Sequence, residues 1–212
     1  MRILAACLMT LACASPLFAQ SRTADYPAFA PRVFVEISEQ QFTAKDTFKS
    51  IFGQSAGPFK GGGFDLVLGR NIFVEVSASQ FKKTGQRVFR FESTNYPLGI
   101  PLTTMVTPIE YIGGVRLRRW ARVIPYGGAG VGSFKYEESS TFATAEENVE
   151  VKKNGLVVVG GAEFRLFRWV GATVDAHYSR VNDILGQGGI SQVYNENDLG
   201  GAAARFRVLV GR

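Results

Sequence analysis

Apolar and polar residues alternate one by one along most of the chain. Near the start of the pattern, Val33, Val35 and Ile37 alternate with Glu36 and Ser38. Successive side chains of a β-strand point to opposite faces, so this alternation predicts strands with one apolar and one polar face. Eight such segments are recognised, at residues 32–41, 59–69, 72 onward with a continuation into 88–92, 103–118, 123–136, 154–166, 169–181 and 198–211. The chain is therefore predicted to be all-β, and the facing of the glycine-rich segment 123–136 is left open.

The connections between these segments alternate in length. Three are short, at residues 70–71, 119–122 and 167–168, and four are longer and polar, near 42–58, 83–101, 137–153 and 182–197. A closed up-and-down barrel with both termini at one end has three connections at that end and four at the other. Short periplasmic turns and longer external loops are typical of outer-membrane barrels. The expected fold is an eight-stranded antiparallel up-and-down transmembrane β-barrel, with short periplasmic turns and four longer external loops.

The first long connection contains a helical pattern. Phe48, Ile51 and Phe52 follow i, i+3, i+4 spacing, and Gly53 stands where a helix would be capped. The apolar face of this short helix has two interpretations. It is either a contact for a partner or a lipid, or part of a loop folded onto the rim of the barrel, which we favour.

The charges on the polar face bear on which face points inward. A soluble lipocalin-like barrel that carries an apolar ligand would place its apolar side chains inside, and a membrane barrel does the reverse. The charged residues of the polar faces are Glu36, Asp65, Glu75, Glu110, Glu163 and Asp175 with Arg116, Arg118, Arg165, Arg205 and Arg207. Every base in this set is an arginine, whose planar fork suits enclosed, paired carboxylates. We therefore expect these residues to form a charge network inside the barrel.

Aromatic residues gather at both ends of the predicted strands. Trp120, Tyr126, Phe167 and Trp169 lie near the short turns, and Phe42, Phe59, Phe81, Phe134, Tyr136 and Tyr178 lie near the long loops. Two aromatic girdles that bound an apolar band are expected at membrane interfaces. The alternative is that these are ordinary core aromatics.

The first nineteen residues differ from the rest of the chain. Arg2 precedes an apolar run at residues 3–14, and the segment 15–18 leads to Ala19, after which cleavage is expected. A basic start, a short apolar run and a small residue at the cleavage site are typical of a secretory signal peptide. We expect a signal peptide at residues 1–19 and the barrel at residues 20–212; a lipoprotein signal ending at Cys13 is the alternative. Both cysteines, Cys7 and Cys13, would leave with the leader.

Charge and composition narrow the choice of partners. The net charge is +6, but no block of lysines and arginines supports nucleic-acid binding. One histidine and no cysteine after residue 19 make a transition-metal site unexpected, and no cofactor is expected. Basic residues near the long loops are Lys82, Lys83, Lys135 and Arg180. They are candidates to meet lipopolysaccharide phosphates, with a solvated rim as the alternative.

Two glycine-rich segments, Pro125 to Gly132 and Gly160 to Arg165, resemble the fifth and sixth strands of small eight-stranded outer-membrane barrels, the group of the OmpA transmembrane domain and OmpX. The resemblance implies a location in the bacterial outer membrane, contact with its lipids and insertion by its assembly machinery. A barrel of eight strands is just wide enough for its own side chains. We expect a monomer without a wide pore that acts through its external loops, in binding, adhesion or envelope integrity.

A catalytic alternative rests on His177 and Ser179. Period two places both on one face, beside Asp175. The pair resembles the His-x-Ser of outer-membrane lipid A deacylases, which are also eight-stranded barrels, and Glu196 is a remote candidate for the acid. We favour the simpler interpretation, in which His177 joins the interior polar network.

Overall fold

The computed structural model describes residues 29–69, 71–92, 94–120, 122–140, 148–186 and 189–211. The predicted signal peptide, with Cys7 and Cys13, lies outside the described residues. Its cleavage therefore stays a prediction.

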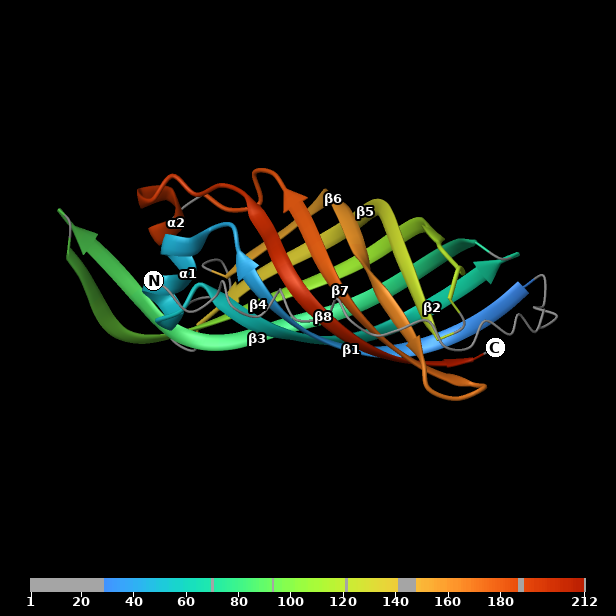
Figure 1. The fold of residues 1–212 in the computed structure, drawn as a ribbon. Coiled ribbons are helices and arrows are strands. Elements are labelled where there is room, and N and C mark those ends of the chain that lie inside the picture. Colours follow the sequence, from blue (N-terminus) through green and yellow to red (C-terminus); the bar gives the residue numbers. More distant parts are fainter. Residues whose placement is uncertain are drawn as a thin grey trace, which may run out of the picture.

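Eight antiparallel strands form a closed barrel in which each strand pairs with its neighbours in sequence and the last pairs with the first (Figure 1). The strands are β1 (Phe29–Phe42), β2 (Ala56–Leu68), β3 (Ile72–Phe91), β4 (Thr94–Arg116), β5 (Val123–Ser139), β6 (Val149–Arg165), β7 (Val170–Val181) and β8 (Leu199–Gly211). Two short helices, α1 (Lys45–Phe52) and α2 (Gly189–Val193), lie between strands. The predicted all-β, eight-stranded, up-and-down fold is confirmed.

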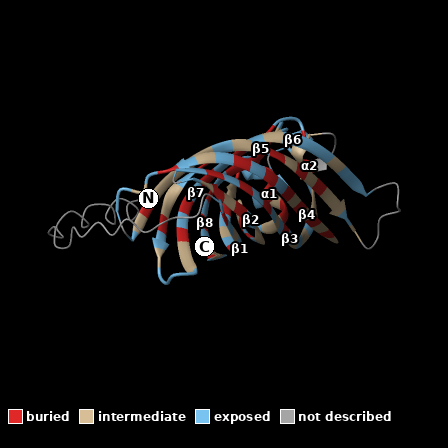
Figure 2. Cartoon of the chain, turned by 90° about the vertical axis from the view of Figure 1, so that its right-hand side faces the viewer, coloured by how far each residue is buried: buried red, intermediate tan, exposed pale blue. Residues whose placement is uncertain are grey.

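Apolar side chains face outward over the middle of the barrel, and charged side chains face inward. Along β7, Val174 is 54% exposed while the next residue, Asp175, is 4% exposed. The same alternation of buried and exposed positions runs along the other strands (Figure 2). We call the exposed apolar side chains along the middle of the strands the outer belt. They include Val33, Val35, Ile37, Phe64, Val74, Val76, Ile109, Tyr111, Val115, Val131, Leu156, Val158, Phe164, Val174, Phe206 and Val210. An exposed apolar belt around a charged interior is the arrangement of transmembrane barrels, the reverse of a lipocalin.

The strands extend further than predicted at the end that carries the long connections, which we call the mouth. A longer polar connection was expected near residues 83–101, but β3 continues to Phe91 and β4 already begins at Thr94, so Pro97 and Pro101 lie within β4. Pro97 pairs with Val88 of β3, and the pairing of β4 with β5 reaches only as far as Thr103. Among the described residues, no strand pairs with the other edge of the proline segment, so a missing N–H is tolerated there. This hairpin projects beyond the other strands in Figure 1.

The connection predicted at residues 137–153 is also shorter than expected. β5 continues to Ser139 and β6 begins at Val149, so Glu137 lies opposite Glu150 in the register of the two strands.

The loop predicted at 42–58 contains α1, as the apolar spacing indicated, and Gly53 ends the helix in the left-handed conformation. The helix prediction is confirmed, whereas α2 was not predicted.

The facing of β5, left open by its glycines, is resolved. Ile124, Phe134 and Tyr136 are buried, so the even-numbered residues of this strand face the interior. Close approach explains one of the glycines, because a Cβ on Gly130 would come within 1.9 Å of the carbonyl oxygen of Tyr111 on β4. Any larger residue at this position would push β4 and β5 apart.

Candidate functional site: the barrel interior and its mouth

Most of the predicted charge network lies together inside the barrel. Nine of its eleven members are buried: Glu36, Asp65, Glu75, Glu110, Arg116, Glu163, Asp175, Arg205 and Arg207. Arg118, two residues after the end of β4, and Arg165, the last residue of β6, are half-buried instead. The structure also brings in Arg32, Tyr126 and Thr173, which were not in the predicted set.

One cluster lies near the short turns. Nη1 of Arg32 donates to Oε2 of Glu163 at 2.7 Å, and its Nη2 donates to Oδ2 of Asp65 at 2.5 Å. Arg116 also donates to Glu163. Four strands, β1, β2, β4 and β6, are thereby joined across the interior by two guanidiniums and two carboxylates.

Arg207 stands at the centre of a second cluster. Its Nη1 donates to Oε2 of Glu75 at 2.6 Å, and its Nη2 lies 3.0 Å from Oδ2 of Asp175. Nη2 also donates to the hydroxyl of Tyr126 at 2.6 Å, and Nε donates to Oγ1 of Thr173 at 3.0 Å. Two carboxylates and two hydroxyls thus satisfy a single guanidinium, as burial of a charge requires.

Arg205 continues the network toward the mouth. Its Nε donates to Oδ1 of Asp175 at 2.7 Å, and its Nη1 lies 3.8 Å from carboxylate oxygens of both Glu36 and Glu110. Nε2 of His177 lies 3.0 Å from Oε2 of Glu110. His177 is therefore a member of the interior network, as the favoured interpretation of the sequence held.

These side chains leave little free space. The first two clusters enclose a cavity of about 10 Å³, lined by Arg32, Asp65, Glu75, Arg116 and Arg207 among others. That volume is about what one water molecule needs. The paired side chains therefore fill this part of the barrel, where a wide pore would have to run.

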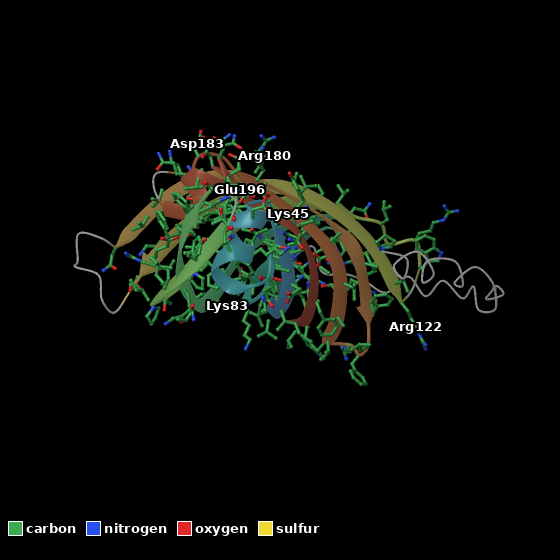
Figure 3. All side chains as sticks on the ribbon, turned by 90° about the vertical axis from the view of Figure 1, so that its left-hand side faces the viewer. Lys45, Lys83, Arg122, Arg180, Asp183 and Glu196 are labelled. Atoms are coloured by element: carbon green, nitrogen blue, oxygen red, sulfur yellow. The ribbon has the colours of Figure 1, made fainter. Side chains whose placement is uncertain are left out.

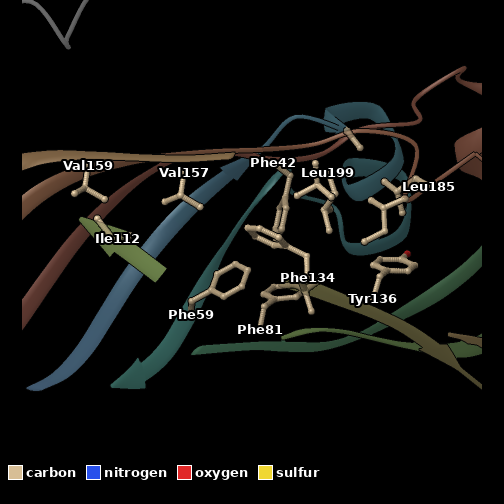
Figure 4. Packing of buried hydrophobic residues seen from close by; sticks show 14 of the residues in the cluster. Phe42, Phe59, Phe81, Ile112, Phe134, Tyr136, Val157, Val159, Leu185 and Leu199 are labelled. Carbon is tan, nitrogen blue, oxygen red and sulfur yellow. The ribbon is translucent and has the colours of Figure 1, made fainter. Parts of the chain in front are cut away.

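Toward the mouth, the interior is closed by aromatic side chains. We call Phe42, Phe59, Phe81, Phe134 and Tyr136 the aromatic plug; all five are buried (Figure 4). They were expected in a lipid-facing girdle, and that prediction was wrong, as it was for Tyr126, which also points inward. Trp120, Phe167, Trp169 and Tyr178 are exposed, as a girdle requires. An aromatic side chain suits either face, so its residue type alone could not place it.

Helix α1 completes the plug. The ring of Phe48 stacks on Phe42 with centroids 3.8 Å apart, and Ile51 is buried on the same face of the helix. Figure 3 shows α1 inside the ring of strands at the mouth. The helix thus folds into the barrel, which corresponds to the favoured rim interpretation of its apolar residues.

Glu196 holds the start of this helix. Its carboxylate accepts hydrogen bonds from the backbone N–H groups of Asp46, at 3.1 Å, and Thr47, at 2.8 Å. Both donors belong to the first turn of α1, which has no side-chain cap of its own. A carboxylate at this position satisfies unpaired N–H groups and favours the helix dipole.

Replacing Glu196 with alanine should therefore loosen α1 without unfolding the barrel. By analogy with the loss of a helix cap, we expect a cost of about 1 kcal/mol. Hydrogen exchange should become faster at the amides of α1 and stay unchanged in β6 and β7. The exposed Gln192, replaced with alanine in the same segment, is the control. Unchanged protection of α1 in the Glu196→Ala variant would contradict the capping role.

The same geometry bears on the hydrolase alternative. Ser179 is fully buried and faces the interior beneath Val181, and the carboxylate beside His177 belongs to Glu110. The suggested acid, Glu196, instead binds α1. Acyl chains of membrane lipids would lie against the outer belt, so the strand wall separates them from this serine. The geometry thus gives the lipid A deacylase alternative no support.

The described residues contain no group of three or more His, Cys, Asp or Glu side chains arranged to hold a metal ion. None of their helices is long and apolar enough to cross a membrane.

Comparisons with known proteins identify the fold. No family model matches the chain, and no curated protein matches its sequence. The crystal structure of Neisserial surface protein A matches with a TM-score of 0.51 and 10% identity, over 86% of this chain and 96% of that one. Ail of Yersinia pestis, in complex with the heparin analogue sucrose octasulfate, gives 0.48 and 13% over 86% and 97%. The N-terminal β-barrel domain of Pseudomonas aeruginosa OprF gives 0.43 and 12% over 85% and 97%. In its fold, the chain is similar to small eight-stranded outer-membrane β-barrels.

Proposed function

We propose that this chain is an integral protein of the bacterial outer membrane that acts through its mouth and external loops, in binding, adhesion or envelope integrity. The observation that carries the proposal is the combination of an outer belt with an interior filled by paired charges and closed by the aromatic plug. The outer belt makes the barrel a membrane protein, and the filled interior makes it unsuited to bulk diffusion. The external end is then the part of the molecule available to other molecules.

A planar-bilayer recording tests the closed interior. The purified, refolded protein should show no large, steady, porin-like conductance. Insertion must be demonstrated on the same sample by surface-protease digestion of the mouth and by heat-modifiable gel mobility. A steady conductance of porin size from inserted protein would overturn the proposal, and free solubility without detergent would overturn the membrane location.

We also propose that the outer surface near the mouth contacts the phosphates of lipopolysaccharide. Lys60, Lys82 and Lys135 each follow an inward-facing plug residue (Phe59, Phe81 or Phe134), so they point outward at the height of the plug. Lys152 on β6 lies opposite Lys135 on β5 in the strand register, and Arg180 is exposed on β7. We call these five residues the outer cationic arc. Lys83, which the sequence grouped with them, points inward and lies over the ring of Phe52 instead.

Neutralising the arc should weaken the effect of lipopolysaccharide on stability. A basic side chain near an anionic membrane surface contributes about 1 kcal/mol. We expect the triple variant Lys60→Gln, Lys82→Gln, Lys152→Gln to lose about 3 kcal/mol of the extra stability that lipopolysaccharide vesicles give over phosphatidylcholine vesicles. The control removes the same charge from the mouth, with Lys45→Gln, Lys49→Gln and Lys83→Gln. If both triple variants lose the same amount of this extra stability, the effect depends on net charge and not on contact between the arc and lipopolysaccharide.

A further inference from the structure

A hollow lies beyond the aromatic plug, on the inner face of the strands where they extend past the outer belt. We call it the vestibule. It has a volume of about 600 Å³ and lies between the β3–β4 hairpin, the ends of β5 and β6, helix α1 and the segment around α2. This volume is within the range of sites that hold small molecules, about 300–1,000 Å³. Tyr136 contributes both to the plug and to the wall of the vestibule, so the hollow ends where the closed interior begins.

The vestibule is lined mainly by aliphatic side chains. Ile51 from α1, Leu102 from β4 and Ile190 from α2 form a buried cluster of their own, against which Val88 of β3 packs. Val151 of β6 lies on the same lining. These side chains contact each other and also border the hollow, so a ligand in it can bury further apolar surface, which is favourable.

The polar groups of the vestibule limit the charge of its occupant. Arg87 from β3 and Glu138 from β5 both line it, and the hydroxyl of Tyr136 donates a hydrogen bond to Glu138. A third charged lining residue, Glu150, has its carboxylate 3.0 Å from Nζ of Lys135. An anion would gain from Arg87 and be repelled by Glu138, and a cation would meet the opposite pair of effects. An uncharged molecule avoids both penalties.

Thr47 adds one unused hydrogen-bonding group. This residue of α1 lines the vestibule and is 1% exposed, and its hydroxyl has no hydrogen-bond partner among the described residues. A buried hydroxyl without a partner is costly, and native proteins usually satisfy it with a protein group, a water molecule or a ligand. The hydroxyl therefore offers a point of attachment for a polar group on an otherwise apolar molecule.

We propose that the vestibule binds a small, uncharged amphipathic molecule, with an apolar body against Ile51, Leu102 and Ile190 and a hydroxyl or carbonyl group that hydrogen-bonds Thr47. The proposal rests on the proposed function only in that it places this site on the outer side of the membrane. It names the class of ligand that the external end would take.

Binding of 1-naphthol tests the proposal, because this molecule combines an apolar two-ring body with one hydroxyl. The protein in lipid nanodiscs is compared with empty nanodiscs by equilibrium dialysis. We expect one saturable site, with at least about tenfold weaker binding of the anion 1-naphthoate and the cation 1-naphthylmethylammonium, a difference of about 1.4 kcal/mol. Absence of saturable 1-naphthol binding, or equal binding of the three compounds, overturns the proposal.

Matched variants locate the bound probe. Val151→Trp fills the vestibule and should weaken 1-naphthol binding at least about tenfold. Leu156→Trp adds the same ring to the outward face of the same strand and should bind like the wild type. Thr47→Val removes only the hydroxyl and should weaken binding about fivefold. Unchanged binding in Val151→Trp and Thr47→Val would refute the site. Heat-modifiable mobility shows separately that each variant is folded and inserted, so a failure of the membrane proposal is distinguishable from a failure of this one.

Discussion

Replacing Arg207 with methionine should lower the free energy of unfolding by about 3–5 kcal/mol, the usual cost of removing one partner from a buried ion pair. Methionine keeps much of the packing volume but removes every N–H donor. Glu75 is left without the contact at 2.6 Å, and Asp175 and Tyr126 lose their contacts with the guanidinium. The cost arises from carboxylates that stay buried without their counter-charge.

Two further variants distinguish this explanation from a loss of packing. Adding Glu75→Gln to Arg207→Met removes one of the stranded charges and should recover part of the stability. Arg180→Met removes an exposed arginine that lies 3.6 Å from Asp198 and should cost at most about 1 kcal/mol. Urea unfolding in lipid vesicles, followed by the fluorescence of Trp120 and Trp169, measures all three. Equal losses for Arg207→Met and Arg180→Met, or no recovery in the double variant, would contradict the account.

Much of the fold could be predicted because most strands alternate clearly between apolar and polar residues. On β8, Arg205 and Arg207 alternate with Phe206 and Val208, and the structure buries the arginines and exposes Phe206. On β5 the pattern failed, since glycine has no side chain to show which face is apolar. There the facing became clear only from the burial of Ile124, Phe134 and Tyr136 in the structure.

The strand ends were predicted less well than the strand centres. The polar stretch near 83–101 was predicted to be a connection, but the structure continues β3 to Phe91 and begins β4 at Thr94, because polar residues also occur in strands that extend beyond the membrane. Helix α2 has only five residues, too short a segment for a recognisable periodicity.

The partners within the network could not be read from one sequence. Glu110 and His177 lie on β4 and β7, which are not adjacent in the barrel, so their contact depends on its diameter and stagger. Arg32 was missed although a signal existed. It shares the period-two face of Glu36 and was the first residue of the predicted segment 32–41, but it was not counted among the charges of the polar face.

A charged substitution in the outer belt distinguishes a membrane barrel from a soluble one. Val174 lies on the outward face of β7, between Ala162 and Phe206 on the neighbouring strands, about halfway along the belt. An arginine at the middle of a bilayer costs about 2–4 kcal/mol in a transmembrane barrel, and near the interfaces about 0–1 kcal/mol. We therefore expect Val174→Arg to lower the free energy of unfolding in phosphatidylcholine vesicles by about 2–4 kcal/mol.

The cost of an added arginine should depend on its depth in the bilayer, and a control position tests this. Leu156 is also exposed, but it pairs with Arg180 near the mouth, where an added arginine reaches water and lipid headgroups. Leu156→Arg should cost at most about 1 kcal/mol. On a soluble barrel both positions would face water, and each substitution would stay within about 0.5 kcal/mol of the wild type. Equal, small effects at Val174 and Leu156 would mean that no hydrocarbon surrounds the belt. A large loss at Val174 alone requires a hydrocarbon layer around the middle of the barrel.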